Sequence, residues 1–392
     1  MTTHSPTRAR NPLRDRPVYV VGIGMHPYVR PSATTYVTMG LTAMREALAD
    51  ARIAWTDVDS AVVGSGKIGM AAGPTLTGYL GRTGLPVVQV ESASASGSVA
   101  VRQAVHDVAG GFSDVSVAVG VDKAEFPPDA VTKAEVHALT DGLIQFPTKF
   151  ALITERFLQD RGATLEQLGA VAVKNHRNGA LNPYAQRRKA RTLDEVLAPP
   201  YISGSLTRLQ CTPVGEGAAA VVVASAEGLA RLGIDRSRAV PVLASVHHTQ
   251  PAFADAKGTE EEAVTRTAGA EAFEASGIQP ADLDLVEVHD AFSVEEPMYI
   301  EALGVCREGH ALADMAAGRL DIGGRVAVSA SGGLLAMGHP VGPTGVGQVC
   351  ELVRQLRSEA GPRQHPAVRH ALAHMVGVGG VCTVHILGPV GA

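Results

Sequence analysis

The chain has 392 residues, of which 45% are hydrophobic and 4% aromatic, and its formal net charge is only −5. This length and composition predict a globular α/β protein of two packed halves with an insertion, and they exclude a disordered chain. The small, interspersed charge and the lack of an apolar run of about 18 residues argue against nucleic-acid binding and against a membrane helix, so we expect a cytoplasmic protein.

The N-terminal region predicts a tail followed by a series of strands. The first sixteen residues carry four arginines and no apolar segment, so residues 1–16 are expected to be a disordered tail and not a secretory signal. Short valine-rich runs then alternate with amphipathic stretches. This alternation predicts buried sheets between helix layers, with strands at 17–23, 61–64, 86–91 and 115–121.

A basic segment marks the middle of the chain. Residues 122–210 break the strand and helix alternation and contain KNHRNGALNPYAQRRKAR, which has six Lys or Arg and no acid. We expect an inserted loop domain that covers one face of the protein. A solvated charged face is the default interpretation of this segment, but Lys174 and Arg187 are candidates for phosphate recognition.

The second half of the chain repeats the pattern of the first. Both halves contain a strand, a small-residue turn, a helix and a strand, which predicts an internal duplication. The N-terminal half is expected to comprise 17–121 plus 211–238, and the C-terminal half 239–392. Within the region from 211 onward we expect strands starting at Gly217 and at 239–246, 284–288, 325–328 and 381–387, and helices at about 260–275 and after Gly342.

Four cysteines lie far apart, at Cys211, Cys306, Cys350 and Cys382, without CxxC or Cys/His spacing. Neither a disulfide framework nor a metal site is predicted, and a reducing compartment fits this usage.

Ser94 is the first candidate for chemistry. The run VESASASGS places it where a strand turns into a helix, so its side chain is expected near free backbone N–H groups and the positive end of the helix dipole. Such a position favours a nucleophile or a bound oxyanion. A serine that simply caps the helix is the alternative interpretation.

Three histidines are further candidates. His289 follows a strand in VEVHDAF, His339 lies in the glycine-bounded turn of GGLLAMGHPVGPTG, and His374 precedes the last strand in HMVGVGG. Glycine and proline hold the turn around His339 in a constrained conformation, which favours a functional role. His289, taken alone, is more often a hydrogen-bonded structural histidine than a catalyst. For His374, a histidine that lies in a turn without a catalytic role is an equally good interpretation.

These motifs, together with KNHRNGALNPYAQ and VGEGAAAVVV, occur in the order found in a known family. The sequence resembles the thiolase superfamily, and within it the sterol-carrier-protein type of thiolase, from about Pro17 to the C-terminus. The resemblance implies the five-layered αβαβα thiolase fold with two pseudo-repeated halves, a loop domain between them, and a homodimer or higher assembly.

The resemblance also assigns roles to residues. In such enzymes a cysteine of the first motif is acylated by a thioester, the histidine of GHP activates it, and the histidine of HDxF helps hold the thioester oxygen. By position these are Ser94, His339 and His289. The second acid/base cysteine of HDCF is Ala291 here, and the C-terminal CxG cysteine is replaced by an HxxG form with His374, so both reactive sulfurs are missing.

The change from cysteine to serine alters the expected chemistry. A cysteine thiol, whose reference pKa is about 8.5, ionises readily at a helix N-terminus, whereas a serine hydroxyl needs a base to take its proton during attack. Ser94 would therefore depend on His339, and reversible thiolysis of 3-ketoacyl-CoA is disfavoured. The groups expected to polarise the carbonyl are His289, His339 and backbone N–H groups near Gly380.

Three functions follow from this set of residues. The first is an acyltransferase or condensing enzyme that forms an acyl-Ser94 intermediate from an acyl-CoA or acyl-carrier-protein thioester, with no permanently bound cofactor. The second is a thiolase-like retro-aldolase that cleaves a β-hydroxyacyl-CoA with a small OB-fold partner protein, although such aldolases replace the two histidines by tyrosines. Tyr299 is an alternative acid if it faces the cleft. The third is a non-catalytic subunit that binds acyl-CoA.

Overall fold

The computed structural model describes residues 11–124, 146–250 and 258–391. The predicted tail lies outside the described residues up to position 10, but 11–16 are ordered, which corrects that part of the prediction. Helix α1 (Pro12–Asp15) starts with Asn11 as its cap, whose side chain accepts from the Leu13 N–H at 3.1 Å. Asparagine before a proline at the first helical position is a strong helix start, and the buried Leu13 anchors it.

Ten strands form one sheet in the order β10-β9-β11-β12-β8-β1-β7-β4-β2-β3. Five strands belong to the first half and five to the second, and the halves join where β1 and β8 pair through Tyr19 with Pro241 and Val20 with Val240. The strands of the first half are β1 (Val18–Val29), β2 (Ser60–Gly64), β3 (Val87–Val90), β4 (Val115–Asp122) and β7 (Glu216–Ser225). Those of the second half are β8 (Val240–Thr249), β9 (Leu285–Glu287), β10 (Ala327–Val328), β11 (Ala371–Gly377) and β12 (Val381–Leu387).

The two halves share one topology. In each half the strands lie in the order third, second, fourth, fifth, first. The second strand is parallel to the third and the fourth, and the remaining pairs are antiparallel in both halves. This match is the structural counterpart of the repeat that the sequence predicts.

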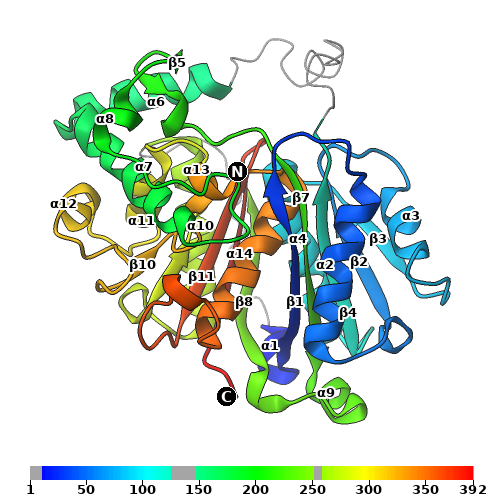
Figure 1. The fold of residues 1–392 in the computed structure, drawn as a ribbon. Coiled ribbons are helices and arrows are strands. Elements are labelled where there is room, and N and C mark those ends of the chain that lie inside the picture. Colours follow the sequence, from blue (N-terminus) through cyan, green and yellow to red (C-terminus); the bar gives the residue numbers. More distant parts are fainter. Residues whose placement is uncertain (1–10, 125–145, 251–257, 392) are drawn as a thin grey trace, which may run out of the picture.

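Helices separate and cover the two half-sheets (Figure 1). Helices α4 (Ser96–Ala109) and α14 (Val341–Leu356) pack against each other and against strands of both halves. Helix α2 (Tyr36–Ala51) covers β1 and β7, and α10 (Glu260–Ser276) covers β8 and β12. The resulting order of helix, sheet, helix, sheet, helix confirms the predicted five-layered α/β fold. Helix α14 is buried on almost every side because it lies in the central layer.

The inserted segment packs on the second half. It contains α6 (Phe146–Arg161), α7 (Leu165–Ala180), α8 (Leu193–Leu197), β5 (Tyr201–Ser203) and β6 (Leu206–Thr207). Its Phe150 ring stacks on Phe292 with centroids 4.5 Å apart, which anchors the insertion beside the HDAF motif. The remaining helices are α3 (Ala72–Gly78), α9 (Ala226–Leu232), α11 (Glu295–Ala302), α12 (Ala311–Ala316) and α13 (Gly333–Met337). Among the helices of the described ranges, none is long and apolar enough to cross a bilayer.

Candidate active site

Ser94 lies in a short, tightly held turn between β3 and α4. The turn is a 3₁₀ segment, Ala93–Ala95, and the Ser96 hydroxyl donates to the Ala93 carbonyl at 2.6 Å while accepting from the Ser92 N–H at 2.9 Å. Ala93 has φ +47°, a left-handed conformation that is disfavoured for a residue with a Cβ. The surrounding hydrogen bonds hold this conformation, and Ser94 is placed just before the first turn of α4.

His339 meets Ser94 across the interface between the two halves. Its Nε2 lies 2.9 Å from Ser94 Oγ, and its Nδ1 lies 2.9 Å from Thr344 Oγ1. The Thr344 hydroxyl donates its only proton to the Pro340 carbonyl at 2.6 Å, so it can only accept from His339. The proton of the neutral ring is therefore on Nδ1, and Nε2 is free to accept from Ser94. This is the arrangement of a hydroxyl nucleophile and its base.

His339 is kept neutral by its surroundings. Burial lowers its pKa well below the usual value, and the nearby His289 and Lys67 lower it further. A histidine with a depressed pKa is unprotonated at neutral pH, and so its Nε2 is available to take the Ser94 proton.

His289 lies beside His339 and is oriented by a buried carboxylate. The two imidazole rings are 5.2 Å apart and meet edge to face at 89°. His289 Nδ1 is 3.2 Å from Glu295 Oε1, and Glu295 also accepts from the Tyr299 hydroxyl and the Phe292 N–H, each at 2.8 Å. His289 Nε2 is buried and has no hydrogen-bond partner within the part of the chain that the structure describes.

His374 and Tyr299 both lie inside the protein, next to His289 or to its partner Glu295. His374 lies in strand β11, not in a turn, and is fully buried, with Nε2 2.9 Å from Thr265 Oγ1 and Nδ1 accepting from the His289 backbone N–H at 3.5 Å. Burial lowers its pKa to about 3, with His289 as a smaller cause. Tyr299 is also fully buried, so it faces no cleft and cannot contact a substrate. His374 accepts a hydrogen bond from the His289 backbone, and Tyr299 donates one to Glu295, the carboxylate that contacts the His289 ring.

The structure corrects the phosphate-binding prediction for Lys174. This side chain is 3% exposed, and its ammonium pairs with the buried Glu296 at 3.0 Å and donates to the Val328 carbonyl at 2.7 Å. A buried, paired ammonium cannot reach a phosphate at the surface. The helical spacing of α7 turns Lys174 toward the core, which the count of charges along the sequence does not reveal.

Arg187 has a bridging role inside the protein. Its guanidinium donates to the carbonyl oxygens of Cys211 at 2.8 Å, Leu335 at 3.0 Å and Arg208 at 3.2 Å. These bonds tie the inserted segment to α13. These hydrogen bonds to carbonyl oxygens occupy the guanidinium, whereas the basic segment in the sequence suggests that Arg187 binds a phosphate.

The turn around Gly380 lies beside the turn that carries Ser94. Gly380 has φ +69° between β11 and β12, and a Cβ on Gly377 at the end of β11 would lie 2.5 Å from the Ser92 carbonyl. In the described ranges no hydrogen bond uses the amide of Ser94 or that of Gly380. The role of these N–H groups in polarising the thioester carbonyl stays a prediction.

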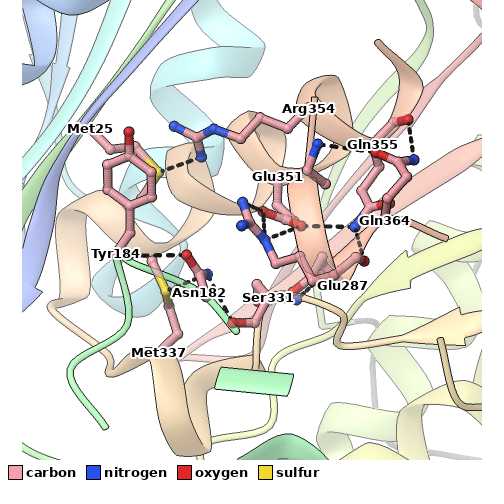
Figure 2. A network of polar contacts seen from close by, with 12 residues as sticks. Met25, Asn182, Tyr184, Glu287, Ser331, Met337, Glu351, Arg354, Gln355 and Gln364 are labelled. Atoms are coloured by element: carbon pink, nitrogen blue, oxygen red, sulfur yellow. Dashed lines mark hydrogen bonds and ion pairs between the residues drawn. The ribbon is translucent and has the colours of Figure 1, made fainter. Parts of the chain in front are cut away.

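A buried polar network supports the loop that leads to His339 (Figure 2). Asn182 donates to the Ser331 carbonyl at 2.9 Å, and Ser331 donates its N–H to Glu287 at 2.8 Å, with its hydroxyl 2.6 Å from the other carboxyl oxygen. Burial, and then the nearby Glu351, raise the pKa of Glu287 to about 8. The network connects strand β9, which precedes His289, with the loop that precedes His339.

Sequence reasoning missed Thr344 and Glu295. Thr344 is five residues after His339 in the first turn of α14, and Glu295 is six residues after His289 in the first turn of α11. Polar residues at the start of a helix that follows a candidate histidine are the signal that could have found them. Across the described residues there is no group of three or more His, Cys, Asp or Glu that could hold a metal, and all four cysteines are free and buried.

Comparison with known proteins relates both halves to one family. Residues 18–227 match the model of the thiolase N-terminal domain, and residues 245–388 match that of the thiolase C-terminal domain-like family. Sterol carrier protein 2 of Oryctolagus cuniculus is 35% identical over 94% of this chain and 71% of that protein. The benzoylsuccinyl-CoA thiolase subunit BbsB of Thauera aromatica is 34% identical over 93% of this chain and 96% of that protein.

A solved structure shares the fold. An Ltp2-ChsH2(DUF35) aldolase superposes with a TM-score of 0.80 over 95% of this chain and 98% of that chain, at 24% identity. At this identity the likeness concerns the fold alone.

Proposed function

The chain belongs to the thiolase family, and from this membership we propose that it is an acyltransferase in which Ser94 accepts the acyl group of a CoA thioester and passes it to an acceptor. The single observation that carries this proposal is the 2.9 Å contact between Ser94 Oγ and His339 Nε2, with the opposite ring nitrogen bonded to Thr344. A serine that only capped a helix would not need an oriented, neutral imidazole on its hydroxyl.

The names of relatives support a CoA thioester as the acyl donor. The relative from Thauera aromatica is named for benzoylsuccinyl-CoA, and another, from Methanothermobacter thermautotrophicus, is an acetyl-CoA acetyltransferase that is 33% identical over 95% of this chain. In our proposal CoA arrives and leaves with each turnover and is not a resident cofactor. These names favour CoA over an acyl carrier protein as the carrier.

The acylation step follows from the geometry of the pair. Ser94 Oγ attacks the thioester carbonyl carbon while its proton moves to His339 Nε2. The amide N–H groups of Ser94 and Gly380 are the proposed donors to the oxygen that becomes negative. The C–S bond then breaks, and the proton on His339 passes to the leaving sulfur, which departs as the CoA thiol. His339 returns to its neutral form, and an acyl ester remains on Ser94.

Intact-mass measurement after mixing with a panel of acyl-CoAs tests this proposal. We expect the wild-type chain to gain the mass of one acyl group, and Ser94→Ala to gain none and to lose acyl transfer. Ser94→Cys should be acylated faster than the wild type, because a thiol at this helix start ionises more readily than a hydroxyl.

Two outcomes would replace the proposal by another. If Ser94→Ala cleaved β-hydroxyacyl-CoA as fast as the wild type and no adduct formed, the protein would be a retro-aldolase. If neither His289→Ala nor His339→Ala changed any rate in the complete assembly, it would be a non-catalytic acyl-CoA-binding subunit.

The assembly is also part of the proposal. The relative BbsB is named as a subunit, and the aldolase that shares this fold is named with a DUF35 component, which favours a small OB-fold partner protein. We further propose a homodimer. Strand β3 is at the edge of the sheet, and Val88 on it is 46% exposed. A light-scattering mass equal to one chain would contradict the dimer.

A further inference from the structure

Glu295 decides which nitrogen of His289 carries the proton. Its carboxylate accepts from three donors: the Tyr299 hydroxyl, the Phe292 N–H and His289 Nδ1. Burial raises the pKa of Tyr299 well above its usual value, so its hydroxyl keeps its proton and donates it. With the proton of His289 held on Nδ1 by a carboxylate, Nε2 of the neutral ring carries a lone pair.

This tautomer changes the role of His289. A neutral ring with its proton on Nδ1 has no hydrogen on Nε2, so it cannot donate there to a thioester oxygen. It can accept a proton there, and the Glu295 carboxylate stabilises the imidazolium that results. Nε2 is buried and without a partner in the described ranges, and the ring lies 5.2 Å from that of His339.

We propose that His289 is the base that deprotonates the acyl acceptor, and that Glu295 is the residue that positions it. This inference rests on the proposed acyl-Ser94 intermediate and adds a second proton-transfer group to it. Two other residues of the predicted site do not fit this role. Ala291 offers no acid or base, and both nitrogens of His374 are engaged.

The transfer step balances with this assignment. The acceptor, an O–H, N–H or activated C–H compound, attacks the ester carbonyl carbon, and its proton moves to His289 Nε2. A new bond forms between the acceptor and the acyl carbon, and the bond from that carbon to Ser94 Oγ breaks. The proton on His289 then passes to Oγ, either directly or through His339, and the hydroxyl is restored. No oxidant or further reagent is needed.

Glu295→Gln tests the proposal because it exchanges an acceptor for a donor. The Phe292 N–H requires an oxygen, so the amide must turn its NH₂ toward His289 Nδ1, which moves the ring proton to Nε2 and removes the base. The enzyme is mixed with acetyl-CoA, the acyl-enzyme is separated from free CoA thioester, and hydroxylamine is added as an N–H acceptor. Intact mass follows the formation of the acyl group on Ser94 and its loss.

We expect acylation of Glu295→Gln at a rate within a few-fold of wild type, and loss of the acyl group slowed by about 10²-fold or more, as for removal of a general base. Tyr299→Phe is the matched control: it removes a hydrogen bond to the same carboxylate but leaves the carboxylate to hold the His289 proton on Nδ1, so any effect should fall on both rates alike and not on the loss of the acyl group alone. Thermal unfolding of each variant reports whether it is folded.

His289→Gln provides a second variant, with the same expected split between the two half-reactions. If acylation and transfer fell together in either variant, His289 would be a donor to the thioester oxygen and the proposal would be wrong. An unchanged transfer rate in Glu295→Gln would also overturn it. If the wild-type chain formed no acyl adduct at all, the proposed function would fail, and this inference would fail with it. If the wild type formed the adduct but both variants transferred the acyl group at the wild-type rate, the inference alone would be rejected.

Discussion

At the scale of residues, the proposed chemistry uses the Ser94 hydroxyl where the resemblance to thiolases implies a cysteine thiol. A serine cannot be ionised by a helix dipole alone, so the base must be neutral, close and correctly oriented. All three conditions are met at His339. Its low pKa keeps it unprotonated, its Nε2 is 2.9 Å from Ser94 Oγ, and Thr344 fixes its tautomer.

Thr344→Val should slow acylation of Ser94 by about 10- to 100-fold. Valine keeps the size of this 3% exposed side chain but leaves His339 Nδ1–H without an acceptor, so the tautomer with the proton on Nε2 gains population and cannot accept from Ser94. The rate of acyl-Ser94 formation, followed by intact mass after rapid quenching, measures the effect. Thr344→Ser, which retains the hydroxyl, should react at nearly the wild-type rate, and equal rates for both variants would contradict this role.

At the scale of elements, close packing of α4 against α14 brings the two reactive groups together. A Cβ on Gly97 would lie 2.1 Å from the Gly342 carbonyl, and one on Gly120 of β4 would lie 2.3 Å from the same oxygen. These glycines allow backbone to touch backbone where the two helices begin. Ser94 precedes α4 and His339 precedes α14, so their 2.9 Å contact depends on this approach.

Gly97→Ala should separate the two helices and thereby Ser94 from His339. We expect the free energy of unfolding to fall by about 1–3 kcal/mol, as for overpacking of a buried site, and acylation to fall with it. Denaturant titration and the acylation assay measure the two effects. Gly78→Ala is the control, because a Cβ there meets nothing within 4 Å, and it should leave both unchanged or slightly stabilise the fold. Full activity in Gly97→Ala would show that the close approach is unnecessary.

At the scale of the whole molecule, the site exists because one fold occurs twice. Helix α4 follows the third strand of the first half, and α14 follows the third strand of the second half after the short α13. Stacking the halves on a shared helix layer places corresponding helix starts side by side. One start carries Ser94, the proposed nucleophile, and the other carries His339, its proposed base.

The buried carboxyl of Glu287 should make the stability of the whole fold depend on pH. The pKa of Glu287 is about 8 in the folded protein, whereas an unfolded glutamate ionises near pH 4.5. Between pH 4.5 and pH 8 Glu287 is therefore protonated in the folded state and ionised in the unfolded state. Stability contributed by this group is therefore full below about pH 4.5 and falls as pH rises to about 8, by an amount on the order of 4 kcal/mol at most.

Denaturant unfolding at pH 5.5 and pH 8 tests this, with Glu287→Gln as the comparison. The variant cannot ionise, so its free energy of unfolding should fall less over this interval than that of the wild type. Identical falls would mean that Glu287 does not retain its proton in the fold.

The family, the layered fold and the positions of most strands followed from the sequence by itself. An apolar run such as AAAVVVAS predicts a buried strand from the local sequence alone. The ordered motifs identified Ser94 and His339 as a candidate pair, with His289 as its neighbour. The sequence does not predict strand β11, because its glycine-rich end suggests a turn. Residues 11–16 predict a tail by their charge, although Asn11 and Pro12 begin a short helix.

Only the tertiary structure decided how these residues are used. Ser94 and His339 are 245 positions apart, and their contact arises from the packing of α4 on α14. Lys174 and Tyr299 proved to be buried, His374 to lie behind the site, and Glu295 and Thr344 to set the tautomers of the two imidazoles. Burial and hydrogen-bond partners are properties of segments brought together by folding, so no local pattern in the chain contains them.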